Sequence, residues 1–153
     1  YIPASEGCNI IEGAVQKDFV DQGGPIKPRD RFAGGGNKVT KQTTGSIKAL
    51  DPVTGETKAT AKTELPNWAG VLATAGNLVF TGLWEGAVVA YDGRTMKEVW
   101  RFDTGCGVMA PPMSYSVNGK QYIAVAVGPH WLGVKPSVLK YANACSMVYV
   151  FTL

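Results

Sequence analysis

Residues 45–56 read GSIKALDPVTGE, and residues 86–97 read GAVVAYDGRTMK. The two stretches align without a gap at a spacing of 41 residues. The matching positions are Gly45/Gly86, Ile47/Val88, Ala49/Ala90, Asp51/Asp92 and Thr54/Thr95. A period of about 40–45 residues in a chain of β-type segments is typical of β-propeller blades, each of which is a four-stranded sheet. The repeat therefore predicts an all-β propeller fold.

Each copy of the repeat is patterned as a hairpin. A short apolar run ends at an Asp that precedes Pro or Gly, and such an Asp favours a turn because its carboxylate binds backbone N–H groups two residues on. A second strand-like run follows each turn, ETKATAKTE at 56–64 and KEVWRFDT at 97–104. The alternation of strand and turn signals predicts paired antiparallel strands.

Three further segments extend the pattern. Residues 70–82 predict a hairpin around Ala75-Gly76-Asn77, and residues 111–128 predict another around Asn118-Gly119, the preferred pair for a type I′ turn. Residues 146–153 predict a closing strand. No window predicts an amphipathic helix, and residues 9–44 are expected to be largely loop. Residues 1–153 are thus expected to form about three blades of a single propeller domain.

Three blades cannot close a ring, and an open propeller would expose sheet edges that invite aggregation. We therefore expect further blades to pack against this chain, either from another polypeptide or from an N-terminal part of the same protein. The opening residues, YIPA, already read as a strand. This start leads us to expect a piece or processed product of a longer chain.

Composition narrows the functional classes. The net charge is +3 with a pI of about 8.8, and no block of like charges favours nucleic-acid binding. No apolar run reaches the about 18 residues of a membrane span. The three cysteines lack the spacing of a metal site and are expected to be buried small hydrophobic residues. The sequence does not decide whether Cys8 and Cys145 form a disulfide.

The repeat resembles the tryptophan-docking motif, A-x-D-x-x-T-G-x-x-x-W, of the quinoprotein alcohol dehydrogenases, which are similar to the methanol dehydrogenase large subunit. Each copy departs from the motif once, with Ala59 in place of Trp in the first and Met96 in place of Gly in the second. The motif Trp packs its ring between blades, so neighbours must fill the space beside Ala59. Residues 65–92, LPNWAGVLATAGNLVFTGLWEGAVVAYD, resemble the signature stretch of the same family.

The resemblance implies an eight-bladed propeller of which this chain is the C-terminal portion. Pyrroloquinoline quinone (PQQ) would lie on the axis with a calcium or lanthanide ion. The implied enzyme is a periplasmic oxidoreductase that oxidises a small alcohol, sugar or polyol to the aldehyde or ketone and passes electrons to a cytochrome c. The sequence does not distinguish among these substrates or between the two kinds of metal.

The resemblance also implies site residues. Trp68 would contact the edge of PQQ, and Asn67 and Ala69 flank it. Ala69 stands where Gly is usual, which restricts the approach of the backbone. Ser5 lies close to where the family often has an Asn that bonds the quinone. Two further residues, Trp131 and His130, would lie at the mouth of the substrate pocket, although a lone His is more often structural than catalytic.

No catalytic residue and no metal ligand is expected in this chain. By the resemblance, the base and the metal ligands would all precede Tyr1, and no acidic cluster here could supply the six to eight oxygen atoms that calcium takes. An alternative is a non-catalytic propeller scaffold similar to the outer-membrane assembly lipoproteins, which needs no quinone. The segments PNWAG and GPHWLG favour the enzyme, because a scaffold has no reason to direct two tryptophans at the axis.

Overall fold

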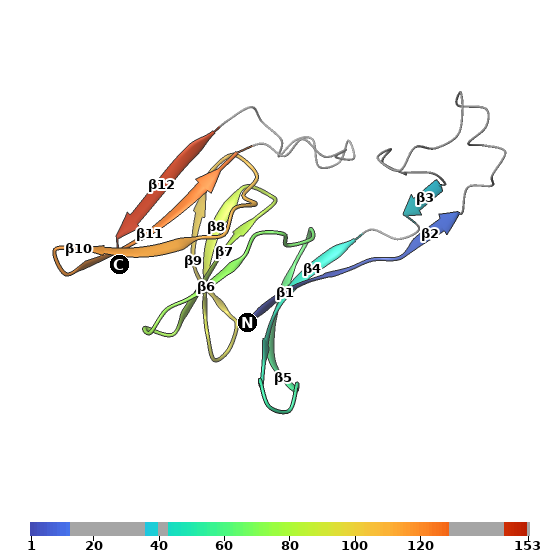
Figure 1. Ribbon diagram of the computed structural model, residues 1–153, viewed down its shortest axis with the longest axis horizontal. Helices are drawn as coiled ribbons and strands as arrows, with labels where there is room; N and C mark the ends of the chain where they lie inside the picture. Colours follow the sequence, from blue (N-terminus) through green and yellow to red (C-terminus); the bar gives the residue numbers. More distant parts are fainter. Residues whose placement is uncertain (13–35, 40–42, 129–145, 153) are drawn as a thin grey trace, which may run out of the picture. The chain divides into compact units, whose positions relative to one another are not determined.

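The computed structural model describes residues 1–12, 36–39, 43–128 and 146–152. The chain divides into two units, one of Tyr1–Glu6 with Thr44–Leu153 and the other of Gly7–Thr43, and each is described by itself. Regular structure in these residues consists of β-strands alone (Figure 1). The all-β prediction is confirmed, and this part of the chain holds no helix that could span a membrane.

The larger unit contains three antiparallel sheets. The first, in the order β1-β4-β5, comprises β1 (Ile2–Glu6), β4 (Thr44–Leu50) and β5 (Thr57–Thr63). The second, in the order β6-β7-β8-β9, comprises β6 (Val71–Ala73), β7 (Leu78–Leu83), β8 (Ala87–Asp92) and β9 (Glu98–Asp103). The third, in the order β10-β11-β12, comprises β10 (Met113–Val117), β11 (Lys120–Val127) and β12 (Met147–Thr152). All of the predicted hairpins are present, and Asn118 and Gly119 both have positive φ, as a type I′ turn requires.

The smaller unit holds one pair of strands inside the segment that the sequence marks as largely loop. β2 (Asn9–Glu12) and β3 (Gly36–Val39) pair in antiparallel register, with Asn9 opposite Val39. The sequence pattern missed this pair because neither strand shows a clear alternation between apolar and polar residues. Residues 13–35 and 40–42 lie outside the described part of the chain.

The 41-residue repeat of the sequence is also a repeat of the backbone. In the first copy Ala49 lies opposite Ala59, and in the second Ala90 lies opposite Trp100. A β-bulge follows the alanine in both copies. The same register and the same irregularity therefore recur one repeat apart, which identifies β4–β5 and β8–β9 as equivalent hairpins.

The turns of these two hairpins share one set of hydrogen bonds. The Oδ1 atoms of Asp51 and Asp92 each accept hydrogen bonds from the backbone N–H groups two and three residues on, at 2.9–3.0 Å. Asp92 accepts a further bond from the Thr95 hydroxyl at 3.0 Å. The pKa of Asp51 is lowered mainly by the N–H group of Thr54, and that of Asp92 mainly by the N–H group of Thr95. The predicted role of the two carboxylates as turn formers is thus confirmed.

The residue that closes each turn has a left-handed backbone conformation. Gly55 has φ 73° and Met96 has φ 54°, and each donates its N–H group to the carbonyl oxygen of the preceding Asp, at 2.9 and 2.8 Å respectively. Glycine adopts this conformation without a steric penalty, whereas methionine does not. The Met96 side chain is 3% exposed and packs in a core cluster with Tyr91. Burial of this side chain offsets the backbone strain.

The two central strands of the second sheet, β7 and β8, are buried on both faces because their successive residues face different neighbours. Val88 and Val89 are both fully buried, and they belong to different core clusters. Val89 packs in a cluster with Ile47 and Ala61 of the first sheet, whereas Val88 packs in a cluster with Val125 of the third. Face-to-face stacking of successive antiparallel sheets is the arrangement of propeller blades.

The two positions of the docking tryptophan differ as the sequence predicts. The Trp100 ring contacts Phe80 of its own sheet and Phe151 of the third, with centroids at 6.4 and 5.0 Å. At the equivalent position, Ala59 packs against the cluster that contains Tyr91 and Met96. The first copy thus contacts this cluster through a methyl group at the position where the second copy has an indole.

The connections between strands differ in length at the two ends of the sheets. Tight turns at residues 51–56, 74–77, 93–97 and 118–119 lie at one end. The connections of residues 64–70, 84–86 and 104–112 leave the opposite end. Because loops carry most binding residues, this second end, which we call the connection end, is where a site is expected.

Candidate functional site

The connection between β5 and β6, residues 64–70, carries three of the predicted site residues. Asn67 is 5% exposed, and its Nδ2 atom donates to the Thr81 hydroxyl at 3.2 Å and to the Gly82 carbonyl oxygen at 3.1 Å. Its Oδ1 atom is buried and has no hydrogen-bond partner among the described residues. One half of the amide thus anchors the loop to β7, and the other half is an acceptor that lacks a donor.

Trp68 and Ala69 point in different directions from this anchored backbone. The Trp68 side chain is 51% exposed, which is high for a tryptophan. Ala69 is 1% exposed, so its methyl group packs inside the protein. Of the predicted cofactor contacts in this loop, only the indole of Trp68 presents a large side-chain surface to solvent.

Ser5 reaches the same end of the structure through Gly45. Ser5 lies opposite Gly45 across the β1–β4 pairing and is exposed. A Cβ atom at Gly45 would lie 2.8 Å from the backbone nitrogen of Asn67 and 2.5 Å from the Leu65 carbonyl oxygen. A larger residue there would displace the 64–70 connection, so glycine permits this close approach. Through Gly45, the fold therefore brings Ser5 and Asn67 to the same neighbourhood.

The remaining two predicted site residues, His130 and Trp131, lie outside the described part of the chain. Their placement at a substrate pocket stays a prediction. Within the described ranges, no group of three or more His, Cys, Asp or Glu side chains could hold a metal ion.

The sequence interpretation missed Trp84, which lies in the short turn between β7 and β8. Its ring centroid is 4.8 Å from that of Trp68, and the two planes are inclined by 32°. The signal was available as LWEG, immediately before the repeat, but nothing in a single sequence shows that this turn meets the 64–70 connection. The two indoles form an aromatic pair at the connection end.

Glu85, next to Trp84, is a second residue that the sequence interpretation missed. It is half-buried, and its Oε2 atom is buried without a hydrogen-bond partner in the described residues. Burial raises the pKa of Glu85, and the nearby charge of Glu64 raises it further, while the backbone N–H groups of both residues and the charge of Arg101 oppose the shift. A carboxyl group with a raised pKa is a feature of functional sites and also of structural networks.

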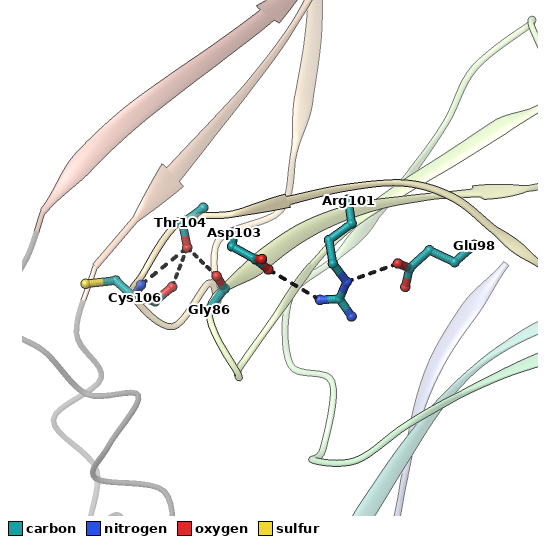
Figure 2. A network of polar contacts seen from close by, with 6 residues as sticks. All are labelled: Gly86, Glu98, Arg101, Asp103, Thr104 and Cys106. Atoms are coloured by element: carbon teal, nitrogen blue, oxygen red, sulfur yellow. Dashed lines mark hydrogen bonds and ion pairs between the residues drawn. The ribbon is translucent and has the colours of Figure 1, made fainter.

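The connection from β9 to β10 is tied to the β7–β8 turn by Thr104 (Figure 2). The Gly86 carbonyl oxygen accepts hydrogen bonds from the Thr104 backbone N–H and from its hydroxyl, both at 2.8 Å. The same hydroxyl lies 2.7 Å from the carbonyl oxygen of Cys106 and also accepts from the Cys106 N–H group. These bonds hold the two connections together at one end of the larger unit.

Cys106 differs from its expected role as a simple buried hydrophobic residue. It is buried, as predicted, but it is also disulfide-bonded. The cross-link adds a covalent restraint to the β9–β10 connection.

Figure 2 also shows Arg101 beside this network, with its Nε atom 3.0 Å from Glu98 and its Nη1 atom 3.8 Å from Asp103.

Comparison with known proteins agrees with this architecture. Residues 34–123 match the PQQ family, described as the β-propeller domain of glucose, ethanol and alcohol dehydrogenases. A quinoprotein ethanol dehydrogenase of Pseudomonas aeruginosa is 43% identical over 71% of this chain, which spans 18% of that relative. A quinoprotein alcohol dehydrogenase of Pseudomonas putida is 36% identical over the entire chain, which spans 26% of that relative.

Solved structures lead to the same assignment. The quinohemoprotein alcohol dehydrogenase of Comamonas testosteroni superposes with a TM-score of 0.63 and 31% identity, over 74% of this chain and 17% of that one. A europium-containing methanol dehydrogenase superposes with a TM-score of 0.65 and 26% identity, over 71% of this chain and 23% of that one. The resemblance noted from the tryptophan-docking repeat is confirmed. This chain belongs to the PQQ family of alcohol dehydrogenase β-propeller domains.

Proposed function

We propose that this chain is part of a PQQ-dependent alcohol dehydrogenase and forms one wall of its cofactor site. The observation that carries the proposal is the 64–70 connection. It fixes Asn67 inside the protein and leaves the Trp68 indole exposed on a rigid backbone. Family membership supports the reaction class, because the relatives are named quinoprotein ethanol and alcohol dehydrogenases.

The residues at the connection end fit a planar ligand rich in oxygen acceptors. PQQ is a flat tricarboxylate quinone that also carries a pyrrole N–H group. The Trp68 indole offers a flat apolar surface, and the exposed Ser5 hydroxyl is able to donate a hydrogen bond. The buried Oδ1 atom of Asn67 is an acceptor without a donor, which a ligand N–H group would satisfy.

When bound, PQQ supplies a two-electron acceptor for the hydride of an alcohol. The role of this chain in that chemistry is to bind and orient the cofactor. Trp68 would lie against the quinone and exclude water from its side. We place the general base outside this chain. Trp131 and His130 are proposed to border the substrate, which would be a small alcohol, a sugar or a polyol.

A metal ion is part of the proposal, with its ligands elsewhere in the protein. One of the structural relatives is a methanol dehydrogenase that contains europium, which supports a lanthanide as one candidate ion. Calcium is the other candidate, and both ions prefer several oxygen ligands. Because the described residues offer no such cluster, the ligands would come from other blades.

The remaining blades of the propeller, eight in all by the resemblance, are the proposed partners of this chain. The outer face of the third sheet exposes large apolar side chains in the described structure: Met113, Tyr115, Val117, Val148 and Val150. An apolar sheet face of this kind is stable when another sheet covers it. The chain spans only 18–26% of the relatives' length, so the rest of a longer protein could supply that sheet. A cytochrome c is the proposed electron acceptor.

A periplasmic location is also proposed. The disulfide at Cys106 supports it, because structural disulfides persist in oxidising compartments such as the bacterial periplasm. The alternative of a non-catalytic scaffold is less well supported, since a scaffold has no need for an exposed indole beside an unpaired buried amide oxygen.

Quinone analysis of the complete protein tests the proposal. Acid extraction of the native sample should release one PQQ per propeller, detected by absorbance and mass. Trp68→Ala should lower that occupancy, whereas Arg94→Ala, in a turn at the opposite end of the sheets, should leave it unchanged. Absence of quinone from the wild type, even after addition of PQQ with calcium or a lanthanide, would favour the scaffold.

A further inference from the structure

We propose that Trp84 is a positioning residue, whose ring holds the Trp68 indole in the orientation in which it meets the quinone. The inference rests on the proposed function, because it concerns how the same site is organised. Neither residue type nor spacing in the sequence assigns Trp84 to a site. Its position beside Trp68 does, with ring centroids 4.8 Å apart and planes inclined by 32°.

The backbone on both sides of Trp68 is held while its side chain extends outward. Asn67 is anchored by two hydrogen bonds to β7, and Ala69 is packed inside the protein. The indole itself is 51% exposed. Its orientation therefore depends on its own two side-chain torsions and on the rings that it contacts.

Trp84 is a suitable support because its own backbone is well held. It lies in the short turn between β7 and β8, where Gly86 donates its N–H group to the Leu83 carbonyl oxygen at 3.1 Å. The Gly86 carbonyl oxygen is in turn bound by Thr104 (Figure 2). Trp84 is half-buried, and Leu83 before it is buried. A ring on such a turn provides a rigid surface for its partner.

Preorganisation of this kind changes cofactor affinity. An exposed indole that moves among rotamers must be ordered when the ligand binds, which weakens binding. A tilted aromatic pair restrains the ring before the ligand arrives. The energy of such a pair corresponds to about a two- to tenfold change in the dissociation constant.

A double-mutant cycle on the complete, cofactor-free protein tests the role of Trp84. Trp84→Ala should weaken PQQ binding about two- to tenfold, and Trp84→Phe should restore most of the affinity because a ring is kept. The double variant with Trp68→Ala should bind no more weakly than Trp68→Ala alone, because Trp84 acts through Trp68. Trp100→Phe, which alters a tryptophan between two sheets, should bind as the wild type does.

A second readout does not depend on the quinone. Two indoles in contact couple their electronic transitions and produce a couplet in far-ultraviolet circular dichroism. The cofactor-free wild type and Trp100→Phe should show the couplet, and Trp84→Phe and Trp68→Ala should lose it. Persistence of the couplet in Trp84→Phe would show that Trp68 and Trp84 are not in contact and would overturn the proposal. This measurement can be made even if the Trp84→Ala variant does not fold.

The outcomes separate the two proposals. PQQ binding by the wild type with equal affinity in the Trp84→Ala variant, or additive effects in the cycle, would overturn the positioning role alone. If the wild type binds no PQQ, the proposed function fails and the positioning role fails with it. A couplet that remains in that case would identify the tryptophan pair as a structural contact only.

Discussion

The ring centroids of Trp100 on β9 and Phe151 on β12 lie 5.0 Å apart, and the two ring planes meet nearly edge-on, at 76°. The two residues belong to different sheets, so this contact joins one blade to the next. Trp100 is the tryptophan of the second motif copy, and the first copy has Ala59 at that place. The two motif copies therefore contribute different side chains to the packing between sheets on the same backbone.

Trp100→Ala should weaken the contact between the second and third sheets. The ring is 37% exposed, so the expected loss of unfolding free energy is about 2–3 kcal/mol, below that of a fully buried tryptophan. Urea unfolding of the complete protein measures it. Val99→Ala, on the same strand but largely exposed, is the control and should cost less than about 1 kcal/mol. Equal losses in the two variants would contradict the docking role.

Ala59→Trp, which restores the family residue, should destabilise this protein. Ala59 packs on a cluster that already includes the buried Tyr91 and Met96 side chains. Overpacking of a filled site costs about 1–3 kcal/mol. Thr60→Ala, at the exposed neighbouring position, serves as the control. A rise in the unfolding midpoint of Ala59→Trp would show that the space beside this strand is empty.

The two left-handed turn positions should respond differently to substitution. Gly55→Ala should lose about 1 kcal/mol, because φ is 73° and no atom lies within 4 Å of the new Cβ, so only the backbone is strained. Met96→Gly relieves similar strain but removes a buried side chain, so a net loss of about 1–3 kcal/mol is expected. Thermal unfolding compares the variants, and a stabilised Met96→Gly would mean that strain outweighs packing.

Glu85→Gln should change how stability depends on pH. The pKa of Glu85 is raised by burial above its ordinary 4.5, so the folded state holds the proton more tightly than the unfolded state. The stability that this provides is complete below the ordinary pKa and is lost as the pH rises through the folded-state value. The variant should therefore be more stable than the wild type at neutral pH, and the difference should shrink in acid. Glu56→Gln, at an exposed turn, controls for the loss of one charge, and a similar pH profile in both variants would refute the prediction.

Asp92→Asn should weaken its turn more than Asp51→Asn weakens the equivalent one. The Oδ1 atom of Asp92 accepts three hydrogen bonds, and its Oδ2 atom accepts one from Asn77 at 3.3 Å. Asp51 accepts two. The pKa of Asp92 is lowered mainly by its bonds from Thr95, and that of Asp51 mainly by its bond from the Thr54 N–H group. The stabilising effect of each carboxylate is therefore present above the ordinary pKa of 3.8 and is lost as the pH falls below it. The unfolding midpoints of Asp92→Asn and the wild type are compared at neutral pH and in acid. They should differ at neutral pH and converge in acid.

Local signals were sufficient for the hairpins. Asp51 and Asp92 predicted turns because their carboxylates bind backbone groups two or three residues away. Asn118-Gly119 predicted a turn because both residues tolerate the positive φ that it requires. Neither signal depends on the rest of the fold. The spacing of 41 residues predicted equivalent hairpins, which the shared register and bulge confirm. The β2–β3 pair was missed, since its strands lack a clear alternation and residues 13–35 separate them, so that no short turn marks them as a hairpin.

The sequence by itself determined the hairpins of the larger unit, the repeat and, through the motif, the family of this protein. Only the tertiary structure decided which connections meet. Trp68 and Trp84 are in contact because residues 64–70 and 84–86 leave neighbouring strands at the same end of the larger unit. The Asn67 amide is held by β7 for the same reason. Turn residues act on their chain neighbours, whereas a site is assembled by packing between sheets, and that packing is a property of the complete fold.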